Sequence, residues 1–370
     1  MPANKPPFDG EWVRLNQLCM KGRSALRQKD LIDDGPYAVY GASGIIGSMS
    51  TFQNGARYVA VVKDGAGVGR ANLCSARTSV LGTMQALIPT EMVLPEYLLH
   101  LIRAMRLGDG FSGSTIPHIY FKDYGQRLVR YVSMADQERI VGMLGSIEDQ
   151  IDILHQQNER FDTLVKSRFV EMFGDGQWKR TALSEVADIQ GGLTKSGKRD
   201  LLPLKLPYLR VANVLRGTLY LDEVLEIGLT AAECEKNLLV EGDLLFVEGN
   251  GSADQIGRCA VWDGSIAPCV HQNHLIRVRF DERVLPVYAL AYFNAHDGRE
   301  QIVARAVNTS GLFTLSTGKV KALQMPLPPL PLQQKFADFV NNVDKSRYIV
   351  QQKIEKLQTL YDSLAQEYFG

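Results

Sequence analysis

The sequence lacks the features of several specialised protein classes. Only five of its 370 residues are cysteine, without a Cys-x-x-Cys pair, so we expect reduced thiols and no disulfide framework. It has no run of about 18 apolar residues and no apolar signal-peptide core near its start, which predicts a cytoplasmic protein without a membrane span. Its 41 basic and 41 acidic side chains cancel, which excludes a generally polycationic binder but allows local charged patches.

An internal repeat is the strongest positive signal in the sequence. Residues 331–370 align without a gap on residues 135–174, with ten identical positions that include Gln137/Gln333 and Phe173/Phe369. Both segments end in an acidic residue, one spacer and Phe-Gly. Because a gapless match of this kind indicates duplication, we expect the whole chain to be built from two related halves.

Apolar residues in both repeats step alternately by four and three, as in a heptad seam. The first seam runs from Ile140 to Val165 and the second from Phe336 to Tyr361. We therefore predict two long helices that pair as an antiparallel coiled coil, with Asn158 and Arg347 setting the register. Two unrelated surface helices, each covering its own domain, are the alternative.

A globular segment precedes each predicted helix. Short runs rich in β-branched residues alternate there with helical patterns and with turns rich in Gly, Asp and Asn, which predicts a mixed α/β fold in the α+β class. The expected order is a globular domain over 8–133, a central helix over 134–174, a globular domain over 178–330 and a C-terminal helix over 331–370.

The order of several short motifs, combined with the duplicated helix, resembles the specificity subunit of type I restriction–modification systems. The motifs are Tyr40–Gly47 (YGASGIIG), Tyr208–Asn213 (YLRVAN), Glu241–Leu245 (EGDLL), Gln272–Arg277 (QNHLIR) and Pro326–Gln334 (PLPPLPLQQ). The resemblance covers nearly the whole chain. It departs from the family pattern in a shorter first domain and in Gln334, where Glu is common.

The resemblance implies a non-catalytic, sequence-specific DNA-recognition subunit of a DNA adenine methyltransferase and restriction endonuclease complex. Two target-recognition domains would each read one half of a bipartite double-stranded target, and the paired helices would fix the spacer between the halves. The implied partners are two copies of a methyltransferase (modification) subunit and a motor–nuclease (restriction) subunit. S-adenosylmethionine, ATP and Mg²⁺ would be bound by those partners and no cofactor by this chain.

Basic side chains gather at matching places in the two copies. The segment 190–216 holds Lys195, Lys198, Arg199, Lys205, Arg210 and Arg216 against the single acid Asp200, and the first-copy loop holds Lys21, Arg23, Arg27 and Lys29. Such local charge suits DNA phosphates or guanine edges, although a solvated loop would look the same. The acidic stretch 222–248 is expected to face away from DNA.

Other candidate DNA-binding residues lie beside glycine-rich turns, in the YLRVAN motif and in hydroxyl-rich loops. They are Lys63, Arg70, Ser114, Asn213, Arg258, Thr309 and Ser310. Tight turns and simple connectors would give the same pattern, so a purely structural role stays open for each of them.

Two other functions fit parts of the sequence. Gly192–Arg199 (GLTKSGKR) nearly matches a phosphate-binding P-loop, but Arg199 stands where the Mg²⁺-binding hydroxyl is required, which disfavours a nucleotide-dependent enzyme. Cys269, His271 and His274 lie close together without a second cluster to complete a metal site, so we predict no metal. A coiled-coil scaffold that binds proteins remains the alternative binding function.

Overall fold

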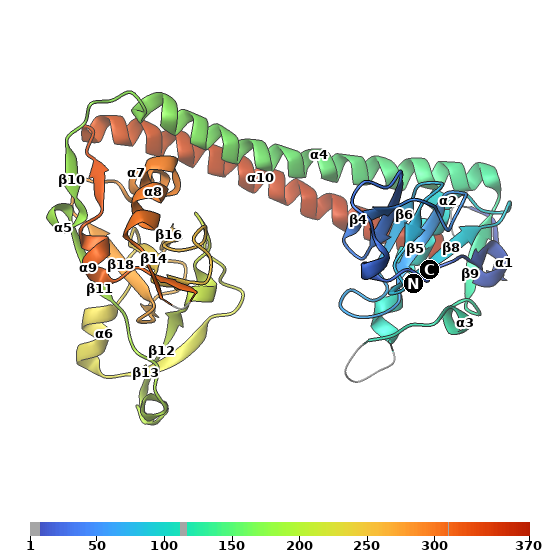
Figure 1. The fold of residues 1–370 in the computed structure, drawn as a ribbon, viewed down its shortest axis with the longest axis horizontal. Coiled ribbons are helices and arrows are strands. Elements are labelled where there is room, and N and C mark those ends of the chain that lie inside the picture. Colours follow the sequence, from blue (N-terminus) through green and yellow to red (C-terminus); the bar gives the residue numbers. More distant parts are fainter. Residues whose placement is uncertain (1–7, 112–116, 310) are drawn as a thin grey trace, which may run out of the picture. The chain divides into compact units, whose positions relative to one another are not determined.

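The computed structural model describes residues 8–111, 117–309 and 311–370 (Figure 1). The chain forms two compact units. The first unit contains residues up to 156 together with 350–370, and the second contains residues 157–349. Each unit combines several small sheets with helices, which confirms the predicted mixed α/β class.

The two long helices that the repeat predicts are present. Helix α4 (Met134–Phe173) and helix α10 (Leu330–Phe369) each have 40 residues. Each helix is divided between the units, so that one part belongs to the first unit and the other part to the second. Within 8–111, 117–309 and 311–370, no helix combines the length and apolar character needed to cross a membrane.

The first unit is built on a four-stranded sheet in the order β2-β8-β5-β6, with a three-stranded sheet β4-β3-β7 and the pair β1-β9. Its strands are β1 (Gly10–Arg14), β2 (Cys19–Lys21), β3 (Tyr37–Gly41), β4 (Gly44–Met49), β5 (Tyr58–Val62), β6 (Ala71–Cys74), β7 (Ser79–Val80), β8 (Met84–Pro89) and β9 (Leu128–Val132). Its shorter helices are α1 (Leu15–Leu18), η1 (Gln28–Asp30), α2 (Pro95–Ala104), η2 (Leu107–Gly110) and α3 (Phe121–Tyr124). Strand β5 (YVAVV) is buried throughout because its alternate residues enter two different hydrophobic clusters, so both faces of the sheet are covered.

The second unit repeats this plan with additional elements. Its sheets have the orders β11-β18-β14-β16, β13-β12-β17, β15-β20-β19 and β10-β21. The strands are β10 (Arg180–Ala182), β11 (Ala187–Gly191), β12 (Leu204–Leu209), β13 (Leu225–Leu229), β14 (Leu244–Val247), β15 (Gly249–Asn250), β16 (Cys259–Val261), β17 (Val270–His271), β18 (Leu275–Phe280), β19 (Val307–Thr309), β20 (Leu312–Thr314) and β21 (Gln324–Pro326). The helices are α5 (Leu183–Val186), η3 (Gly197–Leu201), η4 (Val211–Asn213), α6 (Ala231–Asn237), α7 (Pro286–Asn294), α8 (His296–Arg305) and α9 (Thr317–Lys321).

A buried glutamine attaches each long helix to its own globular fold. In the first unit Leu94 N–H donates to the Gln137 side-chain oxygen at 2.9 Å, and the Gln137 amide donates to the carbonyls of Met92 and Val132. Gln333 makes the equivalent bonds in the second unit, to Leu285 N–H and to two carbonyls. Both glutamines are fully buried, and the groups they bond would otherwise lack partners, which explains why both copies of the repeat have glutamine at this position.

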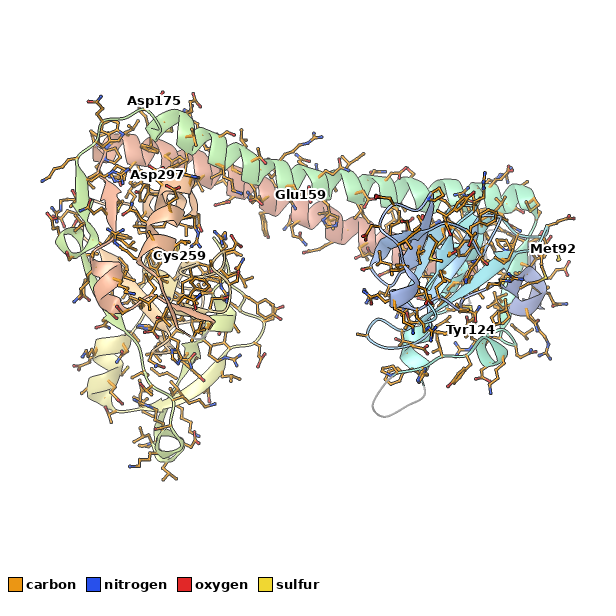
Figure 2. All side chains as sticks on the ribbon, viewed as in Figure 1. Met92, Tyr124, Glu159, Asp175, Cys259 and Asp297 are labelled. Atoms are coloured by element: carbon orange, nitrogen blue, oxygen red, sulfur yellow. The ribbon has the colours of Figure 1, made fainter. Side chains whose placement is uncertain are left out.

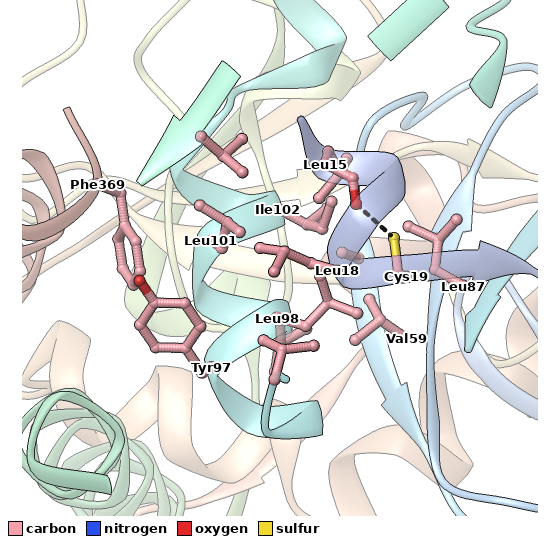
Figure 3. Close-up of a cluster of buried hydrophobic side chains, with 14 of the residues drawn as sticks. Leu15, Leu18, Cys19, Val59, Leu87, Tyr97, Leu98, Leu101, Ile102 and Phe369 are labelled. Atoms are coloured by element: carbon pink, nitrogen blue, oxygen red, sulfur yellow. Dashed lines mark hydrogen bonds between the residues drawn. The ribbon is translucent and has the colours of Figure 1, made fainter. Parts of the chain in front are cut away.

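Aromatic rings complete these two junctions. In the first unit Tyr97 of α2 packs edge-on against Phe369 of α10, with ring centroids 5.2 Å apart (Figure 3). In the second unit Tyr288 of α7 packs against Phe173 of α4 at 4.8 Å. Burying one such side chain contributes roughly 1.5–3 kcal/mol, so the Phe-Gly ends of the repeat anchor each helix end in a core.

The seam residues of the two helices meet inside each unit. In the first unit Ile140 and Leu144 of α4 share a hydrophobic cluster with Tyr361 and Ala365 of α10. In the second unit Phe169 of α4 lies 5.5 Å, centroid to centroid, from Phe336 of α10. The helix segments within each unit therefore pack against one another.

The two polar seam residues also contact each other in the second unit. Arg347 donates to the Asn158 carbonyl at 3.4 Å and forms an ion pair with Asp162 at 2.6 Å. The same guanidinium lies over the Phe161 ring at 5.7 Å. The ion pair with Asp162 fits a register role for Arg347, whereas the buried side-chain oxygen of Asn158 has no hydrogen-bond partner within the described residues, so a register role for Asn158 stays a prediction.

The cysteines are free thiols, in line with the sequence. Cys19, Cys74, Cys259 and Cys269 are buried and Cys234 is half-buried, and none forms a disulfide (Figure 2 labels Cys259). Burial raises the pKa of the Cys19 and Cys259 thiols to about 12, so they remain protonated and unreactive.

Candidate nucleic-acid interface

The basic loop of the first unit is exposed. Lys21 ends strand β2, and Arg23, Arg27 and Lys29 follow it, all with exposed side chains. Arg27 has an acidic neighbour, Asp30, at 3.6 Å, and the Arg27 N–H bond to this carboxylate lowers the pKa of Asp30. Within the described part of the chain Lys21, Arg23 and Lys29 form no ion pair, so their charge is available to an anionic partner.

A buried asparagine holds this loop in place. The Asn54 side-chain oxygen accepts from Arg23 N–H at 3.1 Å, and its amide donates to the Arg23 carbonyl at 3.2 Å. The Asn54 backbone pairs with Thr78 through both N–H groups. The loop carrying Arg23 is thereby tied to the loop between β6 and β7.

That second loop presents a group that sequence analysis missed. The Arg77 guanidinium lies 5.2 Å from the Tyr37 ring centroid and 5.4 Å from the Phe52 centroid, and donates to the Tyr37 hydroxyl at 2.7 Å. Phe52 is 39% exposed and Arg77 is exposed. Arg77 is 40 residues from Tyr37 in sequence, and only its position after a strand, beside small residues, distinguishes it there.

The glycine-rich turn near Lys63 and Arg70 is a tight backbone turn. Gly65, Gly67 and Gly69 all have φ near +85 to +88°, a conformation that favours glycine. Lys63 is half-buried, and exposed Arg70 folds back to donate to the carbonyls of this turn at 3.4 Å. The glycines are therefore explained by the turn itself.

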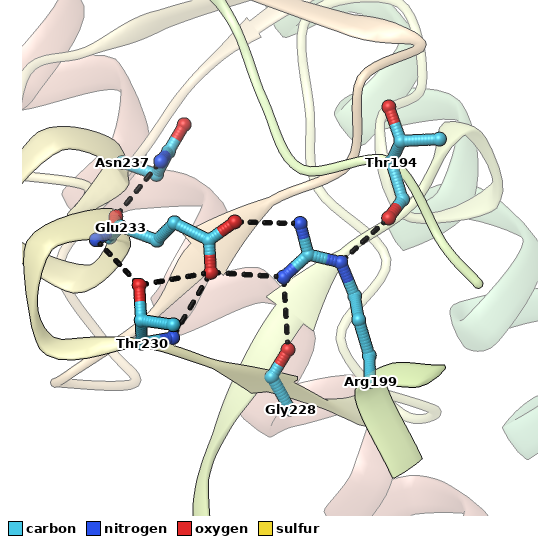
Figure 4. Close-up of polar contacts among 6 residues, drawn as sticks. All are labelled: Thr194, Arg199, Gly228, Thr230, Glu233 and Asn237. Atoms are coloured by element: carbon cyan, nitrogen blue, oxygen red, sulfur yellow. Dashed lines mark hydrogen bonds and ion pairs between the residues drawn. The ribbon is translucent and has the colours of Figure 1, made fainter. Parts of the chain in front are cut away.

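The arginines of the basic loop in the second unit have acidic partners. Arg199 donates to both Glu233 carboxylate oxygens, at 2.8 and 3.1 Å, and also to the carbonyls of Thr194 and Gly228 (Figure 4). The Arg199 guanidinium, followed by Thr230 N–H, lowers the pKa of Glu233 to about 2. Through these bonds Arg199 links α6 to the basic loop.

Three further candidates in the second unit also have structural partners. Asn213 is fully buried, accepts from Arg210 N–H and donates to the carbonyls of Tyr220 and Glu223. Arg210 forms an ion pair with Glu223 at 3.3 Å. Arg258 donates to the carbonyls of Val211 and Val214, and burial lowers its pKa. In this conformation Asn213 cannot touch DNA, and the two arginines are engaged within the fold.

The acidic stretch does not lie wholly away from the basic loop, which corrects the expectation from the sequence. Glu223 and Glu233 both pair with arginines of that loop, because β13 and α6 pack beside it. Lys195 and Lys198 stay exposed, and neither forms an ion pair within the described ranges.

The structure says little about the candidate DNA-binding residues in the hydroxyl-rich loops. Ser114 and Ser310 lie outside the described residues. Thr309 belongs to β19, whose backbone pairs with β20.

The two alternative chemistries gain no support from the geometry. Gly192–Arg199 leads into η3, a 3-10 helix of five residues, instead of the α-helix that a P-loop requires. His271 is fully buried and neither ring nitrogen has a hydrogen-bond partner, whereas His274 is exposed and contacts Glu248 at 2.9 Å. No group of three or more His, Cys, Asp or Glu side chains within the described ranges is placed to hold a metal ion.

Comparison with known proteins finds similarity to type I restriction–modification proteins. Residues 176–359 match the family model described as type I restriction modification DNA specificity domain. The specificity subunit of the type I restriction enzyme EcoKI from Escherichia coli strain K12 is 22% identical over 284 residues, which cover 70% of this chain and 59% of that protein. The chain thus spans about three fifths of the length of this relative.

Solved structures share the fold. The S subunit of a type I restriction–modification system from M. genitalium has a TM-score of 0.55 at 15% identity, covering 100% of this chain and 98% of that one. A structure from work on complex assembly and conformational transition of the type I R-M system has a TM-score of 0.59 at 15% identity, covering 98% of each chain.

Proposed function

Because residues 176–359 match the model of the type I restriction modification DNA specificity domain, we propose that the chain recognises a bipartite double-stranded DNA sequence. Each unit reads one half of the target. The repeat carries the proposal: Gln137 and Gln333 fix the same attachment twice, so two related readers are presented by two equivalent helices.

In the first unit, phosphate contacts come from the exposed cations Lys21, Arg23, Arg27 and Lys29, assisted by Lys63 and Arg70. In the second unit this role falls to Lys195 and Lys198, because the arginines of that loop already have partners. The exposed charge, and not the total charge of the chain, supports this assignment.

The two long helices pair as an antiparallel coiled coil and set the length of the unread spacer. This proposal is supported by the seam contacts within each unit and by the Arg347–Asp162 ion pair. A helix rises about 1.5 Å per residue, so its length converts directly into a distance along DNA.

The chain acts without catalytic residues of its own and serves a multisubunit complex in the cytoplasm. Its partners are two copies of a methyltransferase subunit and a motor–nuclease subunit, which bind S-adenosylmethionine, ATP and Mg²⁺. A chain built from two equivalent halves suits two identical partners.

Methylation mapping tests the proposal. The chain is co-expressed with the modification subunit of its own host in cells that lack other adenine methyltransferases, and methylated adenines are located by sequencing. We expect one bipartite motif that disappears when this chain is omitted. Methylation without a motif, or the same motif in its absence, would refute the proposed function and favour a protein-binding scaffold.

A further inference from the structure

We propose that Arg77 reads a guanine in the half-site of the first unit. This inference rests on the proposed function and deepens it, because it assigns one base contact to one side chain. The side chain was not among the candidates that the sequence indicated.

Neighbouring side chains position the guanidinium of Arg77 before it meets a ligand. Two aromatic rings, Tyr37 and Phe52, lie 5.2 and 5.4 Å from it, and these rings contact each other edge-on with centroids 5.0 Å apart. The Tyr37 hydroxyl accepts one of its N–H groups at 2.7 Å. The two cation–π contacts and the hydrogen bond restrict the orientation of the guanidinium group before any ligand arrives.

No carboxylate neutralises this arginine within the described part of the chain, and its side chain is exposed. Arg57, another exposed arginine of the same unit, is paired with Glu96 at 2.5 Å. A ligand of Arg77 would therefore meet no competing carboxylate within the described residues, whereas a ligand of Arg57 would have to compete with Glu96.

The backbone at Arg77 is also unusual. Its φ is +58°, in the left-handed region that side-chain-bearing residues rarely adopt. The flanking Thr78 is buried, donates to the Ser75 carbonyl at 2.6 Å and contacts the Tyr58 hydroxyl at 3.1 Å. The surrounding fold thus holds a strained conformation that aims the side chain, as functional sites often do.

The position of Arg77 relative to the basic loop favours DNA as the ligand. Asn54 bonds both to Arg23 and, through its backbone, to Thr78, while Gln53 N–H donates to the Ser79 hydroxyl at 3.0 Å. When Arg23 and its neighbours contact phosphates, Arg77 is carried by the same rigid support. Phosphate contacts set the position, and a base edge can then be read beside them.

Guanine is the base that matches this group best. A planar guanidinium can donate two parallel hydrogen bonds to guanine O6 and N7, the commonest specific contact between arginine and DNA. A phosphate contact needs only charge, which lysine supplies equally well, and would not need an oriented fork.

The test is to map methylation motifs for wild type, Arg77→Ala, Arg77→Lys and Arg106→Ala, each co-expressed with the modification subunit. Arg106 is a matched control, because it is exposed in the same unit, has φ of +44° and lies beside Glu148 and Gln358 of the long helices. The half-site that does not change in each data set reports that the variant folds and assembles.

We expect both Arg77 variants to lose a guanine preference of about 10- to 100-fold at one position of one half-site. The other half-site and the Arg106→Ala motif should match wild type. If Arg77→Ala abolishes methylation altogether, the methylation motif of Arg77→Lys is used to judge the proposal.

An unchanged motif in Arg77→Lys would overturn the proposal and indicate a phosphate contact. A wild-type motif in which the half-site of the first unit contains no G·C pair would also overturn it. If the wild-type chain yields no motif at all, the proposed function itself is refuted. That result differs from a wild-type motif that stays the same in the Arg77 variants, which would refute only the role of Arg77.

Discussion

The two basic loops occupy equivalent places in the two units but use their charge differently. In the first unit Arg23 and Lys29 are exposed without an acidic partner in the described part of the chain. In the second unit Glu233 and Glu223 engage Arg199 and Arg210. Loops of similar basic character thus leave most of their cations unpaired in one copy and pair their arginines within the fold in the other.

The difference originates in helix α6 and in the segment between η4 and β13, which carry Glu233 and Glu223. Strand β13 pairs with β12 as β4 pairs with β3 in the first unit, but α6 follows β13 where no helix follows β4, and it brings Glu233 beside the loop. The core attachments around Gln137 and Gln333 remain the same in both units. A shared framework with divergent loops is the arrangement expected of two readers with different targets.

The shared framework is tested by Gln137→Leu and Gln333→Leu. Each change leaves a buried N–H and two buried carbonyls without their partner, so we expect the free energy of unfolding to fall by about 2–4 kcal/mol. Urea denaturation measures this. Gln334→Leu is the matched control, because the only side-chain hydrogen bond of exposed Gln334 within the described residues is to Asp338, and it should change the value by less than about 0.5 kcal/mol. If Gln333→Leu lowered the free energy of unfolding much less than Gln137→Leu, the two helix attachments would not be equivalent.

The exposed charge of the first unit is tested by the triple change Arg23→Ala, Arg27→Ala and Lys29→Ala. Removing three cations from the phosphate-contacting surface should lower the DNA affinity of the assembled complex by about 10- to 100-fold and reduce the salt dependence. Fluorescence anisotropy at several salt concentrations measures both. Arg199→Ala is the contrast and should leave the salt slope nearly unchanged, since Arg199 is bound to Glu233. Equal slopes for wild type and the triple variant would contradict the assignment.

Both units contain one buried, neutral histidine, which predicts how stability depends on pH. Burial lowers the pKa of His100 and of His271 to about 4, below the usual value near 6.5. Because the unfolded chain takes up the proton first, stability is complete above pH 6.5 and is lost as the pH falls towards 4. Each histidine should cost about 1–2 kcal/mol between pH 7 and pH 5.

Replacing His100 with Gln should remove the part of this pH dependence that belongs to the first unit. Gln retains a group that can bond the Tyr361 hydroxyl, which lies 2.8 Å from His100 Nδ1. Urea midpoints at pH 7 and pH 5 provide the measurement, with His271→Gln as the counterpart in the second unit. A His100→Gln chain that loses as much stability on acidification as wild type would disprove this explanation.

The Arg199–Glu233 pair provides the smallest expected effect. Both side chains remain partly exposed, at 15% and 34%, so solvent screening limits their coupling to about 1 kcal/mol. A double-mutant cycle with Arg199→Ala and Glu233→Ala measures it, and Arg210 with Glu223 is a more exposed comparison. A coupling energy of zero would mean that Arg199 is available to DNA after all.

The sequence predicted what depends on periodicity and duplication. The heptad seams and the repeated Phe-Gly ends indicated both long helices, and the seam residues Asn158 and Arg347 do meet. It did not predict pairings between distant residues: Glu233 is 34 residues from Arg199, and Tyr37 is 40 from Arg77. Such contacts depend on how loops return to the sheets, which no local pattern specifies.

The central claim is that two half-site readers are spaced by the paired helices, and lengthening the helices tests it most directly. One heptad is inserted after Gln156 in α4 and one after Ile349 in α10, so that the seam period is kept. Seven residues add about 10 Å of helix, or about three base pairs. Methylation mapping should return the same two half-sites with a spacer about three base pairs longer, whereas an unchanged spacer would contradict the account.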